Sequence, residues 1–194
     1  GLALAAPAQA TPATGEPVAG IPGIEGAALE LEATPAGGRA SLAIADGALT
    51  FPGVFEEPRI PLARLDLRGR WRVQGEQLAV EVEQLDLRNA DATGSFKARW
   101  QTLAGAQGAA RFPGLLDLSG SFSRANGARV HRYLPLVIPA EARHYVRDAI
   151  VRGDARDVAV RVRGDLRQLP FDQHPEAGEF RFAGPVQGVT MAYV

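Results

Sequence analysis

The sequence has 194 residues, no cysteine, 21 basic against 22 acidic side chains and a net charge of -1. Without cysteine it forms no disulfide frame, thiolate nucleophile or zinc knuckle, and its balanced charge provides no positive field for nucleic acid. The hydrophobic fraction of 46% is ordinary for a globular chain, and a chain of this size can bury a sizeable core.

The first 23 residues are almost entirely Ala, Pro, Gly and Thr, with a proline at every fifth position from Pro7. Such a stretch buries too little apolar area to offset its ordering entropy. We therefore expect a linker or disordered arm over residues 1–23 and a single β-rich domain over residues 24–194. Met191 is the only methionine and the chain opens on Gly1, which predicts a segment excised from a longer protein.

Period-two alternation dominates residues 27–100 and places alternate side chains on opposite faces of a strand. Leu29 and Leu31 alternate with glutamates, and a Pro-Ala-Gly-Gly turn follows them. Asp46-Gly47 predicts a hairpin turn. Strands of about 12 residues would run about 40 Å at ~3.3 Å per residue. The pattern therefore predicts a long sheet with one apolar side.

The longest alternating run covers residues 62–74 and is followed by a turn and a second run over 77–89. In the second run the apolar phase changes from even positions, such as Val82, to odd positions, such as Leu85. A β-bulge at Glu83-Gln84 would keep both sets on one face. Six arginines lie at the strand positions that alternate with the apolar ones. They are Arg64, Arg68, Arg70, Arg72, Arg161 and Arg163. We interpret them as a solvated face paired with acids on neighbouring strands; phosphate or lipid head-group contact is the alternative.

One amphipathic helix is predicted around residues 139–151, because Pro139 suits a first helical turn and Gly153 suits a stop. The residues of its apolar stripe follow i, i+3, i+4, i+7, i+8 spacing and are Ala142, Tyr145, Val146, Ala149 and Ile150. The sheet offers the only large apolar surface, so we expect the helix to pack on it and to cover or plug part of it. The predicted fold is mainly β: a long, twisted antiparallel sheet, shaped like a groove or taco, with this helix on its apolar face.

The apolar stripe of the strands is the candidate functional surface. A sheet this long has more apolar area than one helix covers, so the rest must meet another sheet, another chain or an apolar ligand. The candidate groove residues are Leu65, Leu67, Trp71, Val80, Val82, Phe96, Trp100, Phe122, Val160, Val162, Phe180 and Phe182.

Catalytic and metal-binding patterns are weak. His131, His144 and His174 are dispersed without metal-ligand spacing, and no glycine-rich segment has the pattern of a phosphate-binding loop. We expect no catalytic residue, no metal and no cofactor. A hydrolase that uses Asp172 and His174 is kept as a minor alternative.

Several strings resemble one family of bacterial envelope proteins. The run Arg132-Tyr133-Leu134-Pro135-Leu136-Val137-Ile138-Pro139, then Arg163-Gly164-Asp165-Leu166 and Leu169-Pro170-Phe171, closely resembles the central region of the YhdP branch of the AsmA-like proteins, which are related to TamB. Gly23-Ile24-Glu25-Gly26 and Gly38-Arg39-Ala40-Ser41-Leu42 fit as well. The resemblance covers roughly residues 21 to 194, and the Tyr-Leu-Pro-Leu-Val-Ile-Pro string is its most specific part.

This resemblance implies a large protein anchored in the inner membrane of a Gram-negative cell, with most of its mass in the periplasm. Family members look like long curved β-sheets whose apolar groove carries phospholipids toward the outer membrane, and they are not enzymes. The expected partners are phospholipid and neighbouring groove segments of the same chain, with membrane contact through regions absent here and no nucleic acid. The alternative is a closed structural or interaction module that binds a protein partner and touches no lipid.

Overall fold

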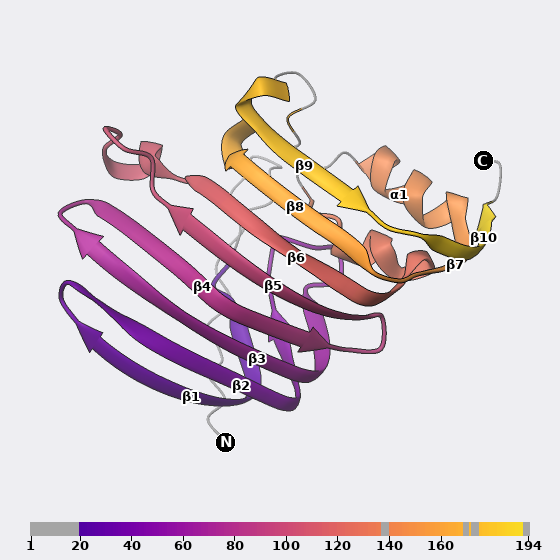
Figure 1. Cartoon of the computed structure of the whole chain (residues 1–194), viewed down its shortest axis with the longest axis horizontal. Helices are drawn as coiled ribbons and strands as arrows, with labels where there is room; N and C mark the ends of the chain where they lie inside the picture. The colour runs from indigo at the N-terminus through magenta and orange to yellow at the C-terminus, as the bar shows by residue number, and fades with distance from the viewer. Residues whose placement is uncertain (1–19, 137–139, 169–170, 172–174, 192–194) are drawn as a thin grey trace.

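A computed structural model of the protein describes residues 20–136, 140–168, 171 and 175–191, and shows one ten-stranded antiparallel sheet (Figure 1). The strands are β1 (Gly23–Thr34), β2 (Gly37–Thr50), β3 (Arg59–Gln74), β4 (Gln77–Arg88), β5 (Ala92–Gln101), β6 (Leu115–Asn126), β7 (Ile150–Ala155), β8 (Val158–Asp165), β9 (Gly178–Ala183) and β10 (Val186–Met191). The helical elements are η1 (Gly108–Arg111), η2 (Gly127–Tyr133), α1 (Ala140–Ala149), η3 (Leu166–Gln168) and η4 (Pro175–Ala177). The prediction of a mainly β fold with long antiparallel strands is confirmed; most of the predicted arm lies outside the described residues.

The sheet follows chain order from β1 to β6 and then divides. Residues 115–122 of β6 pair with β8, which pairs in turn with β9. The last two residues of β6, Ala125 and Asn126, pair instead with β7, and β7 pairs with β10. One end of β6 therefore joins the sheet to the part of the chain that carries η2 and α1.

The predicted β-bulge in β4 is confirmed. On the β3 side the register shifts so that Arg68 pairs with Gln84 and Gly69 pairs with Val82. On the β5 side the register shifts between Val82 and Leu85. The extra residues keep the even and odd apolar positions of β4 on one side of the sheet, as the change of phase required.

The Asp46-Gly47 pair is not a hairpin turn, which corrects the prediction. Strand β2 continues through it to Thr50, and Asp46 has a left-handed φ of 53°. Gly26 of β1 lies opposite this point with a φ of 69°, and the β1–β2 register shifts there. Left-handed residues inside paired strands produce a bulge and a bend, so the same dipeptide that favours a hairpin turn here bends a continuing strand.

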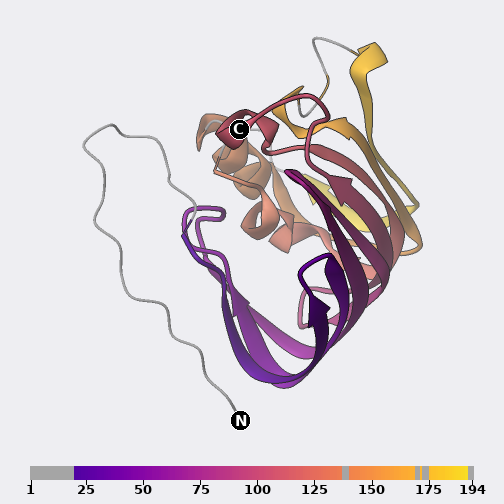
Figure 2. The same ribbon diagram turned by 90° about the vertical axis from the view of Figure 1, so that its left-hand side faces the viewer.

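The bend turns the end of the β2–β3 hairpin over the apolar side of the sheet. Ile60 and Leu62, beyond the bend, belong to the same apolar cluster as Ile44 and Leu65, before it. In the side view the sheet curves like a trough, with η2 and α1 on its inner side (Figure 2). A second cluster of Phe96, Val160 and Val162 forms the core on the other half of the sheet. The apolar side is therefore the concave one.

The helix is shorter than predicted and its packing on the apolar sheet face is not confirmed. It ends at Ala149, because residues 150–155 form β7 and pair with β10. Its neighbours are η2 and β7. A long-range strand pairing thus takes Ile150 and Val151 out of the predicted helix, and local periodicity contains no sign of that pairing.

Candidate functional site

Four adjacent cross-strand rows form what we call the apolar face. In each row the residues are directly paired from strand to strand, and the bulges keep the rows aligned. The rows are Ala27-Ile44-Leu65-Leu87-Gly94-Phe122-Val158, Leu29-Leu42-Leu67-Leu85-Phe96-Gly120-Val160-Phe182, Leu31-Ala40-Gly69-Val82-Ala98-Leu118-Val162-Phe180 and Ala33-Gly38-Trp71-Val80-Trp100-Leu116-Gly164-Gly178. Not one charged or polar side chain interrupts these rows.

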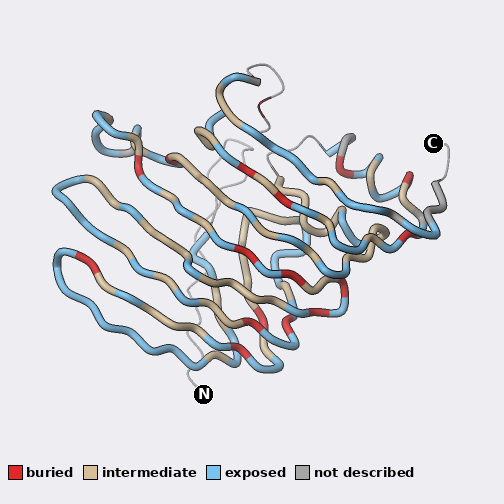
Figure 3. The backbone as a smooth tube through the Cα atoms, in the orientation of Figure 1, coloured by how far each residue is buried: buried red, intermediate tan, exposed pale blue. Residues whose placement is uncertain are grey.

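The register places every candidate groove residue of the strands on this apolar face. The middle of the face is buried, with Leu65 at 4% and Phe96 at 8% exposure. Its two edges are open: Leu29 of β1 is 59% exposed and Phe182 of β9 is 53% exposed. Figure 3 shows the same contrast between the largely exposed strand β1 and the strands inside the sheet. The apolar face therefore continues to both sheet edges with large side chains in contact with solvent.

Two glycines within the apolar rows make room for aromatic rings, a feature that strand periodicity alone did not predict. Gly120 lies opposite Phe96, and a Cβ at Gly120 would meet the Phe96 ring and the Ser95 carbonyl oxygen. A Cβ at Gly94 would lie 2.8 Å from the Phe122 ring. The Phe96 and Phe122 rings contact each other edge to face, with their centroids 4.9 Å apart. The aromatic pair thus fills the space above both glycines.

The opposite side of the sheet, here the charged face, carries ion pairs. Arg70 and Arg99 both pair with Glu81, at 2.6 and 3.2 Å, and Arg161 pairs with Asp117 at 2.5 Å. The hydrogen bond from Arg70 lowers the pKa of the Glu81 carboxyl. Exposed pairs of this kind contribute little to stability. The expected cross-strand pairing with acids is confirmed for Arg70 and Arg161, whereas Arg64 pairs with Asp66 on its own strand.

A hollow of about 450 Å³ lies at the end of the strands where Trp71 and Trp100 are found. Its lining combines Trp100 and Leu116 of the apolar face with Arg70 and Arg163 of the charged face. The Trp100 ring stacks on Phe112, and the Trp100 indole N–H donates to the Pro113 carbonyl at 2.7 Å. The lining also includes the acids Glu81 and Asp117, so this hollow is bordered by both charge signs.

At the opposite end, residues 51–58 form the tip of the β2–β3 hairpin and touch the segment that carries η2 and α1. Arg132 of η2 pairs with Glu57 at 2.7 Å, and Arg143 of α1 pairs with Glu56 at 2.8 Å. The Leu136 amide donates to the Val54 carbonyl at 2.8 Å. We call these three contacts the clasp. The two side-chain pairs join residues 75 and 87 positions apart, and no local pattern predicts a contact over that separation.

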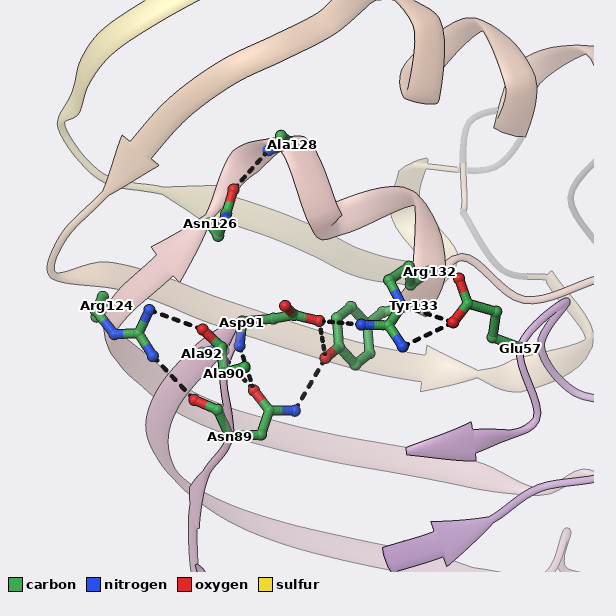
Figure 4. Close-up of polar contacts among 10 residues, drawn as sticks. All are labelled: Glu57, Asn89, Ala90, Asp91, Ala92, Arg124, Asn126, Ala128, Arg132 and Tyr133. Atoms are coloured by element: carbon green, nitrogen blue, oxygen red, sulfur yellow. Dashed lines mark hydrogen bonds and ion pairs between the residues drawn. The ribbon is translucent and has the colours of Figure 1, made fainter. Parts of the chain in front are cut away.

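The clasp is anchored to the β4–β5 turn by a buried polar cluster (Figure 4). Arg132 also pairs with Asp91 at 2.7 Å, and Asp91 is 8% exposed. The Tyr133 hydroxyl donates to Asp91 and accepts from the Asn89 amide, both at 2.9 Å. The Asn89 side-chain oxygen in turn accepts from the backbone amides of Asp91 and Ala92. Asn89, Asp91, Arg132 and Tyr133 therefore satisfy one another, which fixes where η2 sits, although the Nδ1 atom of His131 in η2 is buried without a hydrogen-bond partner.

The Tyr133 hydroxyl is expected to lose its proton at a higher pH than an ordinary tyrosine. Burial, followed by its hydrogen bond to Asp91, raises the pKa of Tyr133 from its usual 10.0 to about 12. A raised pKa means that the stabilising contribution is complete below pH 10 and is lost as the pH rises toward 12. Tyrosinate absorbance should show this late step, and unfolding free energy should fall over the same range. A Tyr133→Phe protein that keeps both features would contradict the assignment.

The predicted helix residues do not form one shared surface. Ala149 is buried and Val146 half-buried, whereas Tyr145 is 59% exposed. Ile150 belongs to β7, and the Ala142 side chain lies outside the described part of the structure. The most buried polar residue of the helix is Arg143, at 8% exposure, which faces the hairpin tip through Glu56.

The described residues hold no group of three or more His, Asp or Glu side chains placed to bind a metal ion. His131 lies in η2 and His144 lies in α1, 3.4 Å from Glu56. Asp172 and His174, the pair of the hydrolase alternative, fall outside the described residues. Across residues 20–136, 140–168, 171 and 175–191, no helix is long and apolar enough to cross a membrane.

Comparison with known proteins identifies the family. The family model described as YhdP protein matches residues 5–194. The chain belongs to the YhdP family. The prediction drawn from the Tyr-Leu-Pro-Leu-Val-Ile-Pro string is thereby confirmed, and the match extends into the Ala- and Pro-rich residues that the resemblance had left out. No curated protein and no solved structure matches the chain. YhdP membership places it in the branch of AsmA-like envelope proteins.

Proposed function

We propose that this chain is part of a periplasmic conduit that moves phospholipids between the inner and outer membranes and so maintains envelope permeability. The observation that carries the proposal is the uninterrupted apolar face, which crosses eight strands and ends in exposed leucine and phenylalanine side chains. An acyl chain spans half of a ~30 Å hydrocarbon core, and a strand of about 12 residues runs about 40 Å. The face is thus long enough to keep such a chain out of water.

The open edges support neighbouring parts of the same protein as partners. Monomeric proteins rarely leave large apolar patches in solvent, and unpaired strand edges favour further pairing. Leu29 and Leu31 on β1, and Phe180 and Phe182 on β9, would be covered if further strands extended the sheet on either side. Membership of the YhdP family and the absence of cysteine are consistent with a periplasmic segment of a protein anchored in the inner membrane.

In this role the protein performs no catalysis and needs no cofactor. Binding relies on burial of acyl chains, at roughly 25 cal/mol per Å² of apolar surface. The hollow beside Trp100 is lined by Arg72 and Arg163, whose guanidinium groups would pair with a lipid phosphate, and by Glu81, which already holds Arg70. This gives the charged face a second use besides solubility, in line with the alternative considered for its arginines.

Photo-crosslinking in living cells tests the proposal. A photoreactive residue at Leu118 or Phe182, on the apolar face, should capture phospholipid in the full-length protein. The same photoreactive residue placed at Ser119 or Arg181, each adjacent to one of these positions in its strand, lies on the charged face and should capture little. Capture from the charged face alone would show that the faces are assigned wrongly.

The competing candidate is an interaction module that binds a protein partner and no lipid. The burial of the middle of the apolar face, where Val160 is 6% and Val162 is 8% exposed, favours it. The exposed edges favour the conduit. Crosslinks from Leu118 and Phe182 to protein, with no lipid adduct, would decide for the interaction module.

A further inference from the structure

The clasp closes a ring at one end of the sheet. Starting from the hairpin tip, residues 51–58, the ring runs through η2 to β7, which pairs with β6. It returns through β5, β4 and β3 to the same hairpin. At the other end, where Trp71 and Trp100 lie, the Arg111 guanidinium of η1 donates to the Glu76 carbonyl and joins the β5–β6 loop to the β3–β4 turn.

The contacts that close the ring are the ion pairs Arg132–Glu57 and Arg143–Glu56 and the hydrogen bond from the Leu136 amide to the Val54 carbonyl. Within the described part of the chain, neither buried apolar cluster includes a residue of the hairpin tip, of η2 or of α1. The two carboxylates are partly exposed, Glu57 at 55% and Glu56 at 39%, whereas their partners Arg132 and Arg143 are 21% and 9% exposed at the side chain. Strands β2 and β3, by contrast, pair continuously along their whole length. The clasp is therefore weaker than the continuous strand pairing on either side of it.

The two halves of the clasp also differ in how firmly they are held. Arg132 is fixed on its own side by Asp91, with Tyr133 sharing that carboxylate. The hairpin tip continues the bent ends of β2 and β3 beyond Asp46, and among the described residues the segment before β1 adds one hydrogen bond, from the Gly20 amide to the Pro52 carbonyl. Separation at the clasp would therefore move the tip and leave η2 in place.

We propose that the clasp is a lateral gate for an acyl chain. In the closed state the clasp blocks access to the apolar face at this end of the sheet. In the open state the hairpin tip has moved away from η2 and α1, and a lipid reaches the apolar face from the side. This proposal rests on the proposed lipid-conduit function, and it identifies the clasp as the place where lipid entry is controlled. The phospholipid acyl chain is the occupant because the clasp closes the concave side of the sheet, and that side carries the apolar face (Figure 2).

An engineered disulfide tests the gate, since the natural chain has no cysteine to interfere. Val54→Cys with Leu136→Cys joins two residues whose backbones are linked by a 2.8 Å hydrogen bond, and formation of the disulfide is checked by loss of free thiol before capture is measured. In the full-length protein, diamide should lock the gate and remove most lipid capture by a photoreactive residue at Leu118. Dithiothreitol should restore it.

The matched control is a cysteine pair at Glu30 and Ser41, which are cross-strand partners on the charged face. Its oxidation should leave lipid capture unchanged. A second variant, Glu56→Ala with Glu57→Ala, removes only partly exposed side chains and should raise capture by opening the gate. Equal capture in the locked and reduced proteins overturns the gate while leaving the conduit intact. Absence of capture in every state overturns the conduit and the gate together.

Discussion

A Phe182→Glu protein should lose lipid capture, whereas Arg181→Glu should keep it. Phe182 ends a continuous apolar row and is 53% exposed, so the protein does not depend on its burial for folding. A carboxylate at this position would have to be desolvated beside an acyl chain. The cost of desolvating an ion in a protein is several kcal/mol, and at ~3 kcal/mol occupancy falls by about 100-fold.

The measurement is the yield of lipid crosslinked to a photoreactive residue at Leu118 in full-length protein, with thermal unfolding of the purified chain as the folding control. Arg181 is the adjacent residue of β9 and points to the charged face, so Arg181→Glu introduces the same carboxylate on the other side of the sheet. An equal loss in both variants would indicate a general charge effect. If neither variant changes the yield, lipid does not contact the β9 edge.

The alternation of apolar and polar residues along the strands could be predicted because it depends only on neighbouring positions in the sequence. Side chains alternate along every strand, and a face that is buried or partnered demands apolar residues at every second position. Even the bulge at Glu83-Gln84 could be read from the change of phase in β4, and the pairing register confirms it. These local signals also placed the candidate residues from Leu65 to Phe182 on one face.

The features that the sequence did not disclose depend on contacts between distant segments. Asp46-Gly47 has the composition of a hairpin turn, but the pairing of β2 with β3 continues past it and converts it into a bend. Ile150 continues the helical spacing, but β10 pairs with it. The clasp joins Arg132 to Glu57 across 75 residues. In each case a tertiary partner decides between local alternatives that the sequence leaves equal.

Gly120→Ala should destabilise the protein, and the effect should depend on Phe96. A Cβ at Gly120 would lie 2.8 Å from the Phe96 Cα and closer still to the Phe96 ring and the Ser95 carbonyl oxygen. Overpacking of this kind costs about 1–3 kcal/mol. Phe96→Ala alone should cost about 3–5 kcal/mol, because the ring is buried at 8% exposure and removing it leaves a cavity.

Urea unfolding of the two single variants and the double variant measures the coupling. In the double variant the ring is gone, so part of the Gly120→Ala cost should disappear, giving a coupling of about 0.5–3 kcal/mol. Gly23→Ala is the matched control, since its Cβ would meet only Thr50, at an ordinary 3.4 Å. We expect Gly23→Ala to change stability by no more than about 0.5 kcal/mol. If the losses of unfolding free energy caused by Phe96→Ala and Gly120→Ala are strictly additive, the Phe96 ring does not occupy the space above Gly120. The close packing described for the centre of the apolar face would then be contradicted.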